Sequence, residues 1–129
     1  MNAHDPDVAA WVRKAENDLR TIRACLQSQD PPWDAVCFHA QQAAEKFLKA
    51  FLVAHRVAPP RVHDLMKLLT LCADHDPSLS SVEPDCSVLT NFALVRYPDI
   101  LEPDAATGRA AVAAAGRICD AIRQRLCSR

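Results

Sequence analysis

Apolar residues recur at helical spacing along most of this chain, and prolines separate the stretches in which they do so. The strongest stripe extends over residues 33–55, where apolar positions follow one another at steps of one, three or four. These positions are Trp33, Val36, Cys37, Ala40, Ala44, Phe47, Leu48, Phe51 and Leu52. Such a stripe predicts an amphipathic helix that buries one side against the rest of the chain.

The same periodicity and its boundary residues predict four further helices. They cover residues 7–27, a stretch that begins at residue 64, residues 84–97 and residues 105–127. Asp5 and Pro6 suit the N-cap and first turn of the first helix, and Asp64 suits the start of the third. Pro98 ends the fourth helix, and the stretch 74–83 is predicted to be a loop.

The composition favours helices throughout. The chain has 129 residues, only two of them glycine, and its apolar content is mostly Ala, Leu and Val. A chain of this length forms one domain, and two glycines are too few for the glycine-rich loops of P-loop or Rossmann nucleotide sites. We therefore expect a single all-α domain over residues 1–129, an up-and-down helical bundle of four main helices plus a short helix.

Charge, hydropathy and cysteine content argue against several classes of protein. Lys plus Arg is 15 and Asp plus Glu is 16, a net charge of −1, which argues against a strongly basic nucleic-acid clamp but not against a local basic patch. The sequence has no apolar run of membrane-spanning length, and residues 1–7 lack the order of a signal peptide, so we expect a cytoplasmic protein. We expect the six cysteines to be reduced, buried side chains, and we expect no metal and no cofactor.

Polar residues line one side of the helix predicted over residues 33–55. His39, Gln42, Lys46 and Lys49 follow one another at steps of three, four and three, with Gln41 and Glu45 alongside. Lysine cations and glutamine amides in this order could hold a phosphate or a ribose. The alternative is that this stripe is the solvated face of an amphipathic helix.

Three further polar positions are candidates for chemistry. His63, beside Asp64 at a helix start, could transfer protons near neutral pH, or the pair could simply cap the helix. Arg96 and Tyr97 precede Pro98, so Arg96 could clamp a phosphate while Tyr97 stacks on a base, or Arg96 could pack on a neighbouring helix. Asp18 on the first helix carries no functional expectation by itself.

Taken in order, these segments resemble the HEPN domain, a helical domain associated with nucleotide binding. The matching stretches are residues 15–20 (AENDLR), 38–50 (FHAQQAAEKFLKA), 62–65 (VHDL) and 96–99 (RYPD). The resemblance implies an up-and-down helical bundle that forms a homodimer. It also implies a partner nucleotidyltransferase encoded nearby, with the pair acting as a toxin–antitoxin or nucleotide-handling module.

Some branches of the HEPN family are metal-independent ribonucleases whose motif is an Arg followed, after four to six residues, by a His. Two such motifs meet in a dimer cleft, where the His helps to deprotonate the ribose 2′-hydroxyl and the Arg stabilises the phosphate. This chain has no His in that window after Arg96. The only formal fit joins Arg56 to His63, within a predicted loop.

The resemblance and the absent motif together favour a non-catalytic HEPN module. It would dimerise and bind a nucleotide, RNA or the partner nucleotidyltransferase through one set of side chains. These are His39, Gln42, Lys46, Lys49, Arg96 and Tyr97. One alternative is a metal-independent ribonuclease toxin with a variant site at His63 and Arg96. Another is a purely structural helical adaptor.

Overall fold

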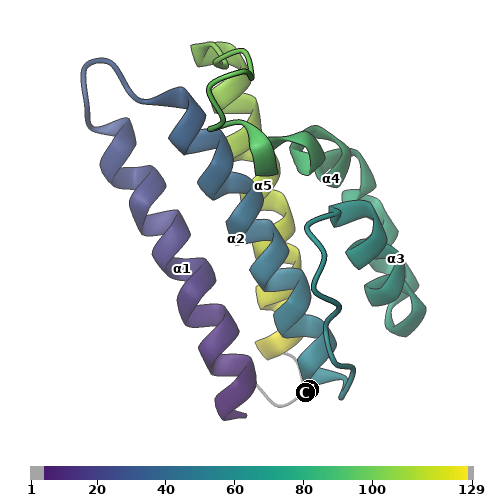
Figure 1. Ribbon diagram of the computed structural model, residues 1–129. Coiled ribbons are helices and arrows are strands. Elements are labelled where there is room, and N and C mark those ends of the chain that lie inside the picture. The colour runs from purple at the N-terminus through teal and green to yellow at the C-terminus, as the bar shows by residue number, and fades with distance from the viewer. Residues whose placement is uncertain (1–4, 128–129) are drawn as a thin grey trace.

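The computed structural model describes residues 5–127, and this part of the chain contains helices and no strand (Figure 1). The α-helices are α1 (Pro6–Leu26), α2 (Trp33–Ala54), α3 (Leu65–His75), α4 (Glu83–Leu89) and α5 (Ala105–Cys127). Two short 3₁₀ helices lie between them, η1 (Pro77–Val82) and η2 (Thr90–Leu94). The predicted all-α helical bundle is confirmed.

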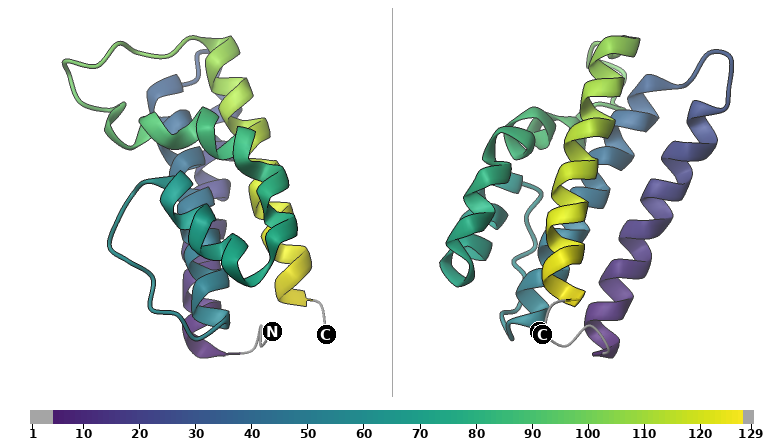
Figure 2. Two further views of the ribbon diagram at one scale, coloured as in Figure 1. Left: turned by 90° about the vertical axis from the view of Figure 1, so that its right-hand side faces the viewer. Right: turned by 180° about the vertical axis from the view of Figure 1, so that it is seen from behind.

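Helix α2 is the centre of the bundle. Helices α1 and α5 both pack on it, and α3 and α4 close the remaining side (Figures 1 and 2). Fourteen of its 22 residues are buried, which is more than a single apolar stripe supplies. Every apolar position predicted to face inward on α2 is buried, and so are three of its polar residues, Gln41, Glu45 and Lys49.

The connector formed by residues 55–64 runs back along α2 before α3 begins (Figure 2). The carbonyl of His63 accepts a hydrogen bond from Gln41, and further along α3 the thiol of Cys72 donates to the carbonyl of Leu48. The connector's end and α3 therefore advance in the same direction as α2, so α3 lies parallel to α2. The connector is what allows two consecutive helices to run the same way.

Helix α5 also runs parallel to α2. Gly108, near its start, lies against Trp33 at the start of α2, and Arg123, near its end, lies over the ring of Phe47. Antiparallel α1 covers another side of α2. The two outer helices thus share α2 as their packing partner (Figure 2, right).

Carboxylates cap the helix starts as predicted. Asp5 Oδ1 accepts a hydrogen bond from the backbone N–H of Asp7, 2.8 Å away, with Pro6 in the first turn. Asp64 Oδ1 accepts from the backbone N–H of Met66 at 3.0 Å. These bonds satisfy amide groups that have no partner inside the helix.

A Schellman turn ends α2 and directs the chain into the connector. The N–H of Val57 donates to the carbonyl of Leu52, and the N–H of Arg56 donates to that of Val53. Arg56 adopts a left-handed conformation with φ of 62°, a position where glycine is the usual residue. The turn places a cation at the end of α2 instead.

The predicted helix over residues 84–97 is wrong in extent. Helix α4 ends at Leu89, and residues 90–94 form the 3₁₀ helix η2. The hydroxyl of Thr90 donates to the carbonyl of Cys86 at 2.8 Å, a side-chain bond that competes with regular α-helical bonding. The predicted loop over 74–83 is also wrong in part, because α3 extends to His75 and η1 occupies Pro77–Val82.

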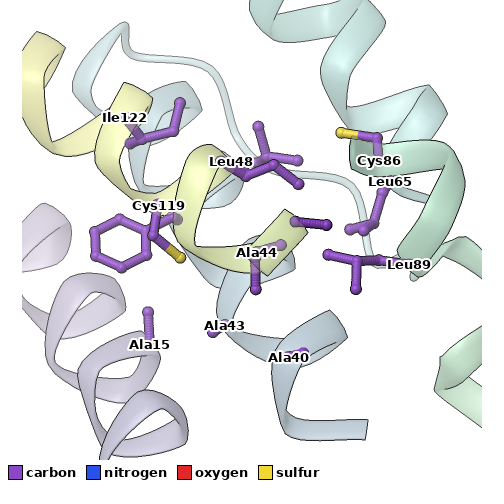
Figure 3. Close-up of a cluster of buried hydrophobic side chains, with 14 of the residues drawn as sticks. Ala15, Ala40, Ala43, Ala44, Leu48, Leu65, Cys86, Leu89, Cys119 and Ile122 are labelled. Atoms are coloured by element: carbon purple, nitrogen blue, oxygen red, sulfur yellow. The ribbon is translucent and has the colours of Figure 1, made fainter. Parts of the chain in front are cut away.

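Small side chains let the helices approach one another in the core (Figure 3). Ala15 of α1 lies toward Ala43 of α2, and Ala44, Leu48 and Ile122 are buried in the same core. Leu26, the last residue of α1, is 39% exposed. Leu79 and Val82 of η1, which lie in the stretch predicted to be a loop, also belong to the core.

The cysteines are free thiols, four of them buried in the core. Burial raises the pKa of the Cys37 thiol to about 11 and that of Cys72, Cys86 and Cys119 to about 12. These thiols therefore stay protonated at neutral pH and pack as small apolar side chains. Cys127 is exposed, which corrects the expectation that all six are buried.

Candidate functional site

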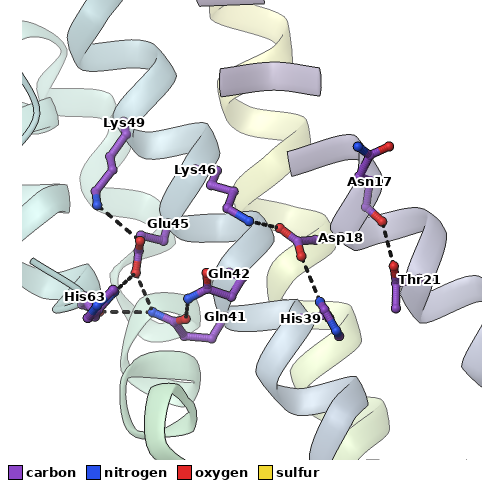
Figure 4. A network of polar contacts seen from close by, with 10 residues as sticks. All are labelled: Asn17, Asp18, Thr21, His39, Gln41, Gln42, Glu45, Lys46, Lys49 and His63. Carbon is purple, nitrogen blue, oxygen red and sulfur yellow. Dashed lines mark hydrogen bonds and ion pairs between the residues drawn. The ribbon is translucent and has the colours of Figure 1, made fainter. Parts of the chain in front are cut away.

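The polar residues of α2 form two ion-pair clusters, each built around a buried carboxylate (Figure 4). We call them the Asp18 cluster and the Glu45 cluster. The first joins α2 to α1, and the second joins α2 to the connector. The solvated helical face that was the alternative interpretation is not what forms.

In the Asp18 cluster, a carboxylate of α1 holds two basic side chains of α2. Lys46 Nζ donates to Asp18 Oδ2 at 2.6 Å, and His39 Nδ1 lies 2.8 Å from Asp18 Oδ1. The Asp18 side chain is 9% exposed, so these contacts supply most of its polar surroundings. Such a cluster fixes the register between α1 and α2, because a buried carboxylate without partners costs several kcal/mol.

In the Glu45 cluster, a carboxylate of α2 collects three donors. Lys49 Nζ donates to Glu45 Oε2 at 3.1 Å, His63 Nδ1 lies 2.8 Å from Glu45 Oε1, and Gln41 Nε2 donates to the same oxygen at 3.1 Å. The Glu45 side chain is 5% exposed and that of Lys49 is 8% exposed. The cluster therefore contains a buried ion pair between α-helical positions i and i+4.

Gln41 and Gln42 extend the Glu45 cluster. Gln41 Nε2 also donates to the carbonyl of His63 at 3.0 Å, and Gln42 Nε2 donates to Gln41 Oε1 at 2.7 Å. Gln41 is fully buried, while Gln42 is half-buried. These amides tie the connector to α2 immediately before α3 begins.

Lys49 is the predicted site residue least able to reach a ligand. Besides its bond to Glu45, its ammonium lies 5.6 Å from the centre of the Trp11 ring of α1. Its cation is thus enclosed by a carboxylate and an aromatic face. Lys46 and Lys49 serve the packing of α1 and the connector on α2.

Arg96 and Tyr97 form a different kind of surface beside the start of α2. The Arg96 guanidinium lies over the ring of Phe38, with its Cζ 5.1 Å from the ring centre. The Phe38 ring in turn meets the His39 ring edge to face, 5.3 Å between centres. Arg96 is exposed, Tyr97 is 60% exposed, and in the part of the chain that the structure describes Arg96 forms no ion pair. We call Arg96, Tyr97 and Phe38 the Arg96 platform.

His63 is the exposed member of the Glu45 cluster, with 68% of its side chain accessible. The buried carboxylate holds Nδ1, which leaves Nε2 as the nitrogen able to exchange a proton with a solvent-side group. The Arg96 side chain contacts α2 at Phe38, whereas the His63 side chain contacts it at Glu45, seven residues further along, or about 10 Å along the helix axis. Within one chain these two candidates have separate anchor points.

Asp18, Glu45 and Trp11 are the residues that organise this region, and sequence reasoning gave none of them a leading role. One signal in the sequence could have identified these carboxylates. Helix α2 carries several basic residues although its apolar stripe predicts that it is deeply buried. Buried lysines require acidic partners. Glu45, four residues before Lys49, and Asp18 on the preceding helix were the carboxylates in reach.

A pair of histidines packs where α2 and α3 both end. The His55 ring lies 4.3 Å from the Phe51 ring and 4.8 Å from the His75 ring, measured between centres. Its Nε2 is buried without a hydrogen-bond partner. Burial, and after it the charge of His75, holds the pKa of His55 below its usual value of 6.5, while Asp76 raises it by a smaller amount.

We expect His55 to make folding weaker in mild acid. Because the folded state lowers the pKa of His55, its contribution is fully present above pH 6.5 and is lost as pH falls below that value. Urea unfolding at pH 7.5 and 5.5 should show a smaller loss of unfolding free energy for His55→Phe than for the parent chain. An equal loss in both proteins would contradict this assignment, and His75→Gln is the further variant that removes the neighbouring ring together with its charge while His55 stays in place.

Within residues 5–127, no three His, Cys, Asp or Glu side chains gather in a way that could hold a metal ion. No helix in this range has the length and apolar character needed to cross a membrane.

Residues 8–125 match the family model described as the HEPN domain. Searches of curated proteins and of solved structures returned no match.

Proposed function

The chain belongs to the HEPN domain family, and from this membership we propose that it is a non-catalytic module that dimerises and binds a nucleotide through the Arg96 platform. Membership supports a role connected with nucleotides or RNA. We further propose a nucleotidyltransferase as the partner protein, with the two acting as a toxin–antitoxin-like pair.

The observation that carries the proposal is an exposed arginine with no acidic partner among the described residues, held on an aromatic ring. A guanidinium fixed in this way can donate two parallel hydrogen bonds to a phosphate. The exposed ring of Tyr97, directly beside it, can stack on a base. The platform therefore offers both parts of a nucleotide a partner.

The α2 residues predicted for binding take a supporting role in this proposal. His39 touches Phe38 and is held by Asp18, so it can orient the ring that carries Arg96. Lys46 completes the Asp18 cluster, and Gln42 and Lys49 complete the Glu45 cluster. The positive charges of Lys46 and Lys49 are already matched by the carboxylates of Asp18 and Glu45.

Exposed apolar side chains near the platform support a subunit interface. They are Val88, Leu94, Tyr97, Ile100 and Leu101. Leu101 is 91% exposed, and with Phe92 and Val95 it borders a groove of about 480 Å³. Exposed apolar side chains beside a groove are typical of protein–protein contacts. We propose that it contributes to the dimer or to the contact with the nucleotidyltransferase.

Arg96→Ala should weaken nucleotide binding. We expect calorimetric titrations with ATP and GTP to show at least a tenfold loss of affinity, since a hydrogen bond to a charged group contributes about 1.5–3 kcal/mol. The matched control is Arg109→Ala, because Arg109 is also exposed and its Cζ lies 5.2 Å from the centre of the Trp33 ring. That variant should bind as the parent chain does.

Each part of the proposal has its own contrary result. Equal affinities for both variants would contradict binding at the Arg96 platform. No binding of ATP or GTP by the parent chain would contradict nucleotide recognition altogether. Sedimentation of the purified chain as a monomer would remove the dimer. If the chain also fails to capture the product of an adjacent nucleotidyltransferase gene, a structural adaptor becomes the better description.

The second candidate function is a metal-independent ribonuclease, which the contact between His63 and Glu45 favours. A buried carboxylate that orients an exposed imidazole is the arrangement of a general base. This function predicts RNA cleavage in EDTA that His63→Ala or Arg96→Ala abolishes. Intact RNA after incubation with the parent chain, or normal cleavage by both variants, would exclude it.

A further inference from the structure

The outer side of α1 carries four cations that the fold does not use. Arg13, Lys14, Arg20 and Arg23 are all exposed. None of them forms an ion pair or another polar contact with any residue in the range 5–127. Arg13 and Arg20 are seven residues apart and lie on one ridge of the helix, with Lys14 and Arg23 on its two flanks.

The acidic residues of the same helix are neutralised from elsewhere. Beyond Asp7, α1 has only Glu16 and Asp18 as acids. Glu16 accepts two hydrogen bonds from Arg123 of α5, at 2.8 and 3.0 Å. Asp18 is held by Lys46 and His39 of α2. The pairing between helices therefore removes both negative charges of this stretch from the outer side and leaves its positive charges unopposed.

We propose that the outer side of α1 binds the phosphate backbone of a single-stranded nucleic acid. Arg13 to Arg23 spans about 15 Å along the helix axis, a length over which one strand of a duplex carries about four phosphates. Arginine forks suit phosphate oxygens better than point charges do. Asn17 and Thr21, which are exposed between the cations, are neutral and small, and Glu16, one turn from both Arg13 and Arg20, is already paired with Arg123. A strand therefore has room to lie close to the helix.

This surface extends the proposed function and shares no residue with the Arg96 platform. The platform recognises a single nucleotide through one guanidinium and a ring. The side of α1 recognises repeated phosphates and is indifferent to the bases. The two surfaces can therefore be tested with different ligands.

The test is fluorescence anisotropy with labelled 20-nucleotide RNA and DNA strands of mixed sequence, at several salt concentrations. We expect Arg13→Gln, Arg20→Gln and Arg23→Gln together to weaken binding by at least about tenfold. The slope of log affinity against log salt should become shallower by about 2, since each lost phosphate contact removes about 0.7 for a single strand. Gln has nearly the helix propensity of Arg, so the variant should fold normally.

The matched control changes three exposed cations elsewhere by the same total charge: Arg61→Gln, Lys67→Gln and Arg109→Gln. Its affinity and salt slope should stay close to those of the parent chain. Equal losses in both triple variants would overturn the proposal, because net charge alone would then explain binding. An unlabelled poly-glutamate that competes as well as RNA of equal charge would also overturn it in favour of an acidic protein partner.

The RNA and DNA strands decide which nucleic acid is the ligand, and binding of either one supports the surface. Arg96→Ala should leave strand binding within about twofold of the parent chain. Binding of strands without binding of ATP or GTP would thus support the surface on α1 and contradict nucleotide binding at the Arg96 platform. The reverse result would keep the platform and lose the surface on α1.

Discussion

Glu45→Ala should lower the free energy of unfolding by about 3–5 kcal/mol, as expected when one partner of a buried ion pair is removed. The substitution leaves the Lys49 ammonium buried without its carboxylate. It also removes the acceptor for Gln41 and His63, which attach the connector to α2. Urea unfolding followed by circular dichroism measures the loss.

The decisive control removes both charges together. Glu45→Leu with Lys49→Leu leaves no unpaired charge, so the double variant should recover a large part of the loss, because apolar replacement of a whole buried pair is often neutral. Asp120→Ala breaks an exposed pair with Arg123 and should cost less than about 1 kcal/mol. If the double variant is as unstable as Glu45→Ala, the loss of unfolding free energy does not come from the unpaired charge of Lys49.

Local features of the sequence predicted much of this fold. The apolar stripe of α2 was buried in full, because spacing along a helix decides which residues share a face. The caps at Asp5 and Asp64 were predicted correctly, since a carboxylate bonds to amides two or three residues away and needs no distant partner. Features that depend on neighbours in sequence are readable from the sequence.

The burial of the polar face of α2 depended on distant parts of the chain. Glu45 and Lys49 belong to the polar side of the predicted helix, and they are buried because the connector and Trp11 of α1 cover them. The spacing of residues within α2 does not indicate how many other segments pack around it. The role of Asp18 likewise depends on a distant residue, because its partner Lys46 lies on another helix.

The replacement of Gly108 by alanine should destabilise the bundle, and the replacement of Gly116 should stabilise it. Both residues lie in α5, so alanine gains the same helix propensity at each, up to about 1 kcal/mol. A Cβ at Gly108 would overlap Cε3 of Trp33 and lie 2.9 Å from its Cζ3, whereas a Cβ at Gly116 meets no atom within 4 Å.

The two alanine variants therefore differ only in packing. Trp33 is 9% exposed and carries the guanidinium of Arg109 on its ring, so it has little room to move when Gly108 gains a methyl group. Overpacking of this kind costs about 1–3 kcal/mol, and we expect the free energies of unfolding of the two variants to differ by about that amount. Equal free energies in urea unfolding would mean that α5 does not approach the start of α2 as closely as the structure places it. Gly108 would then have no role in bringing the two parallel helices together.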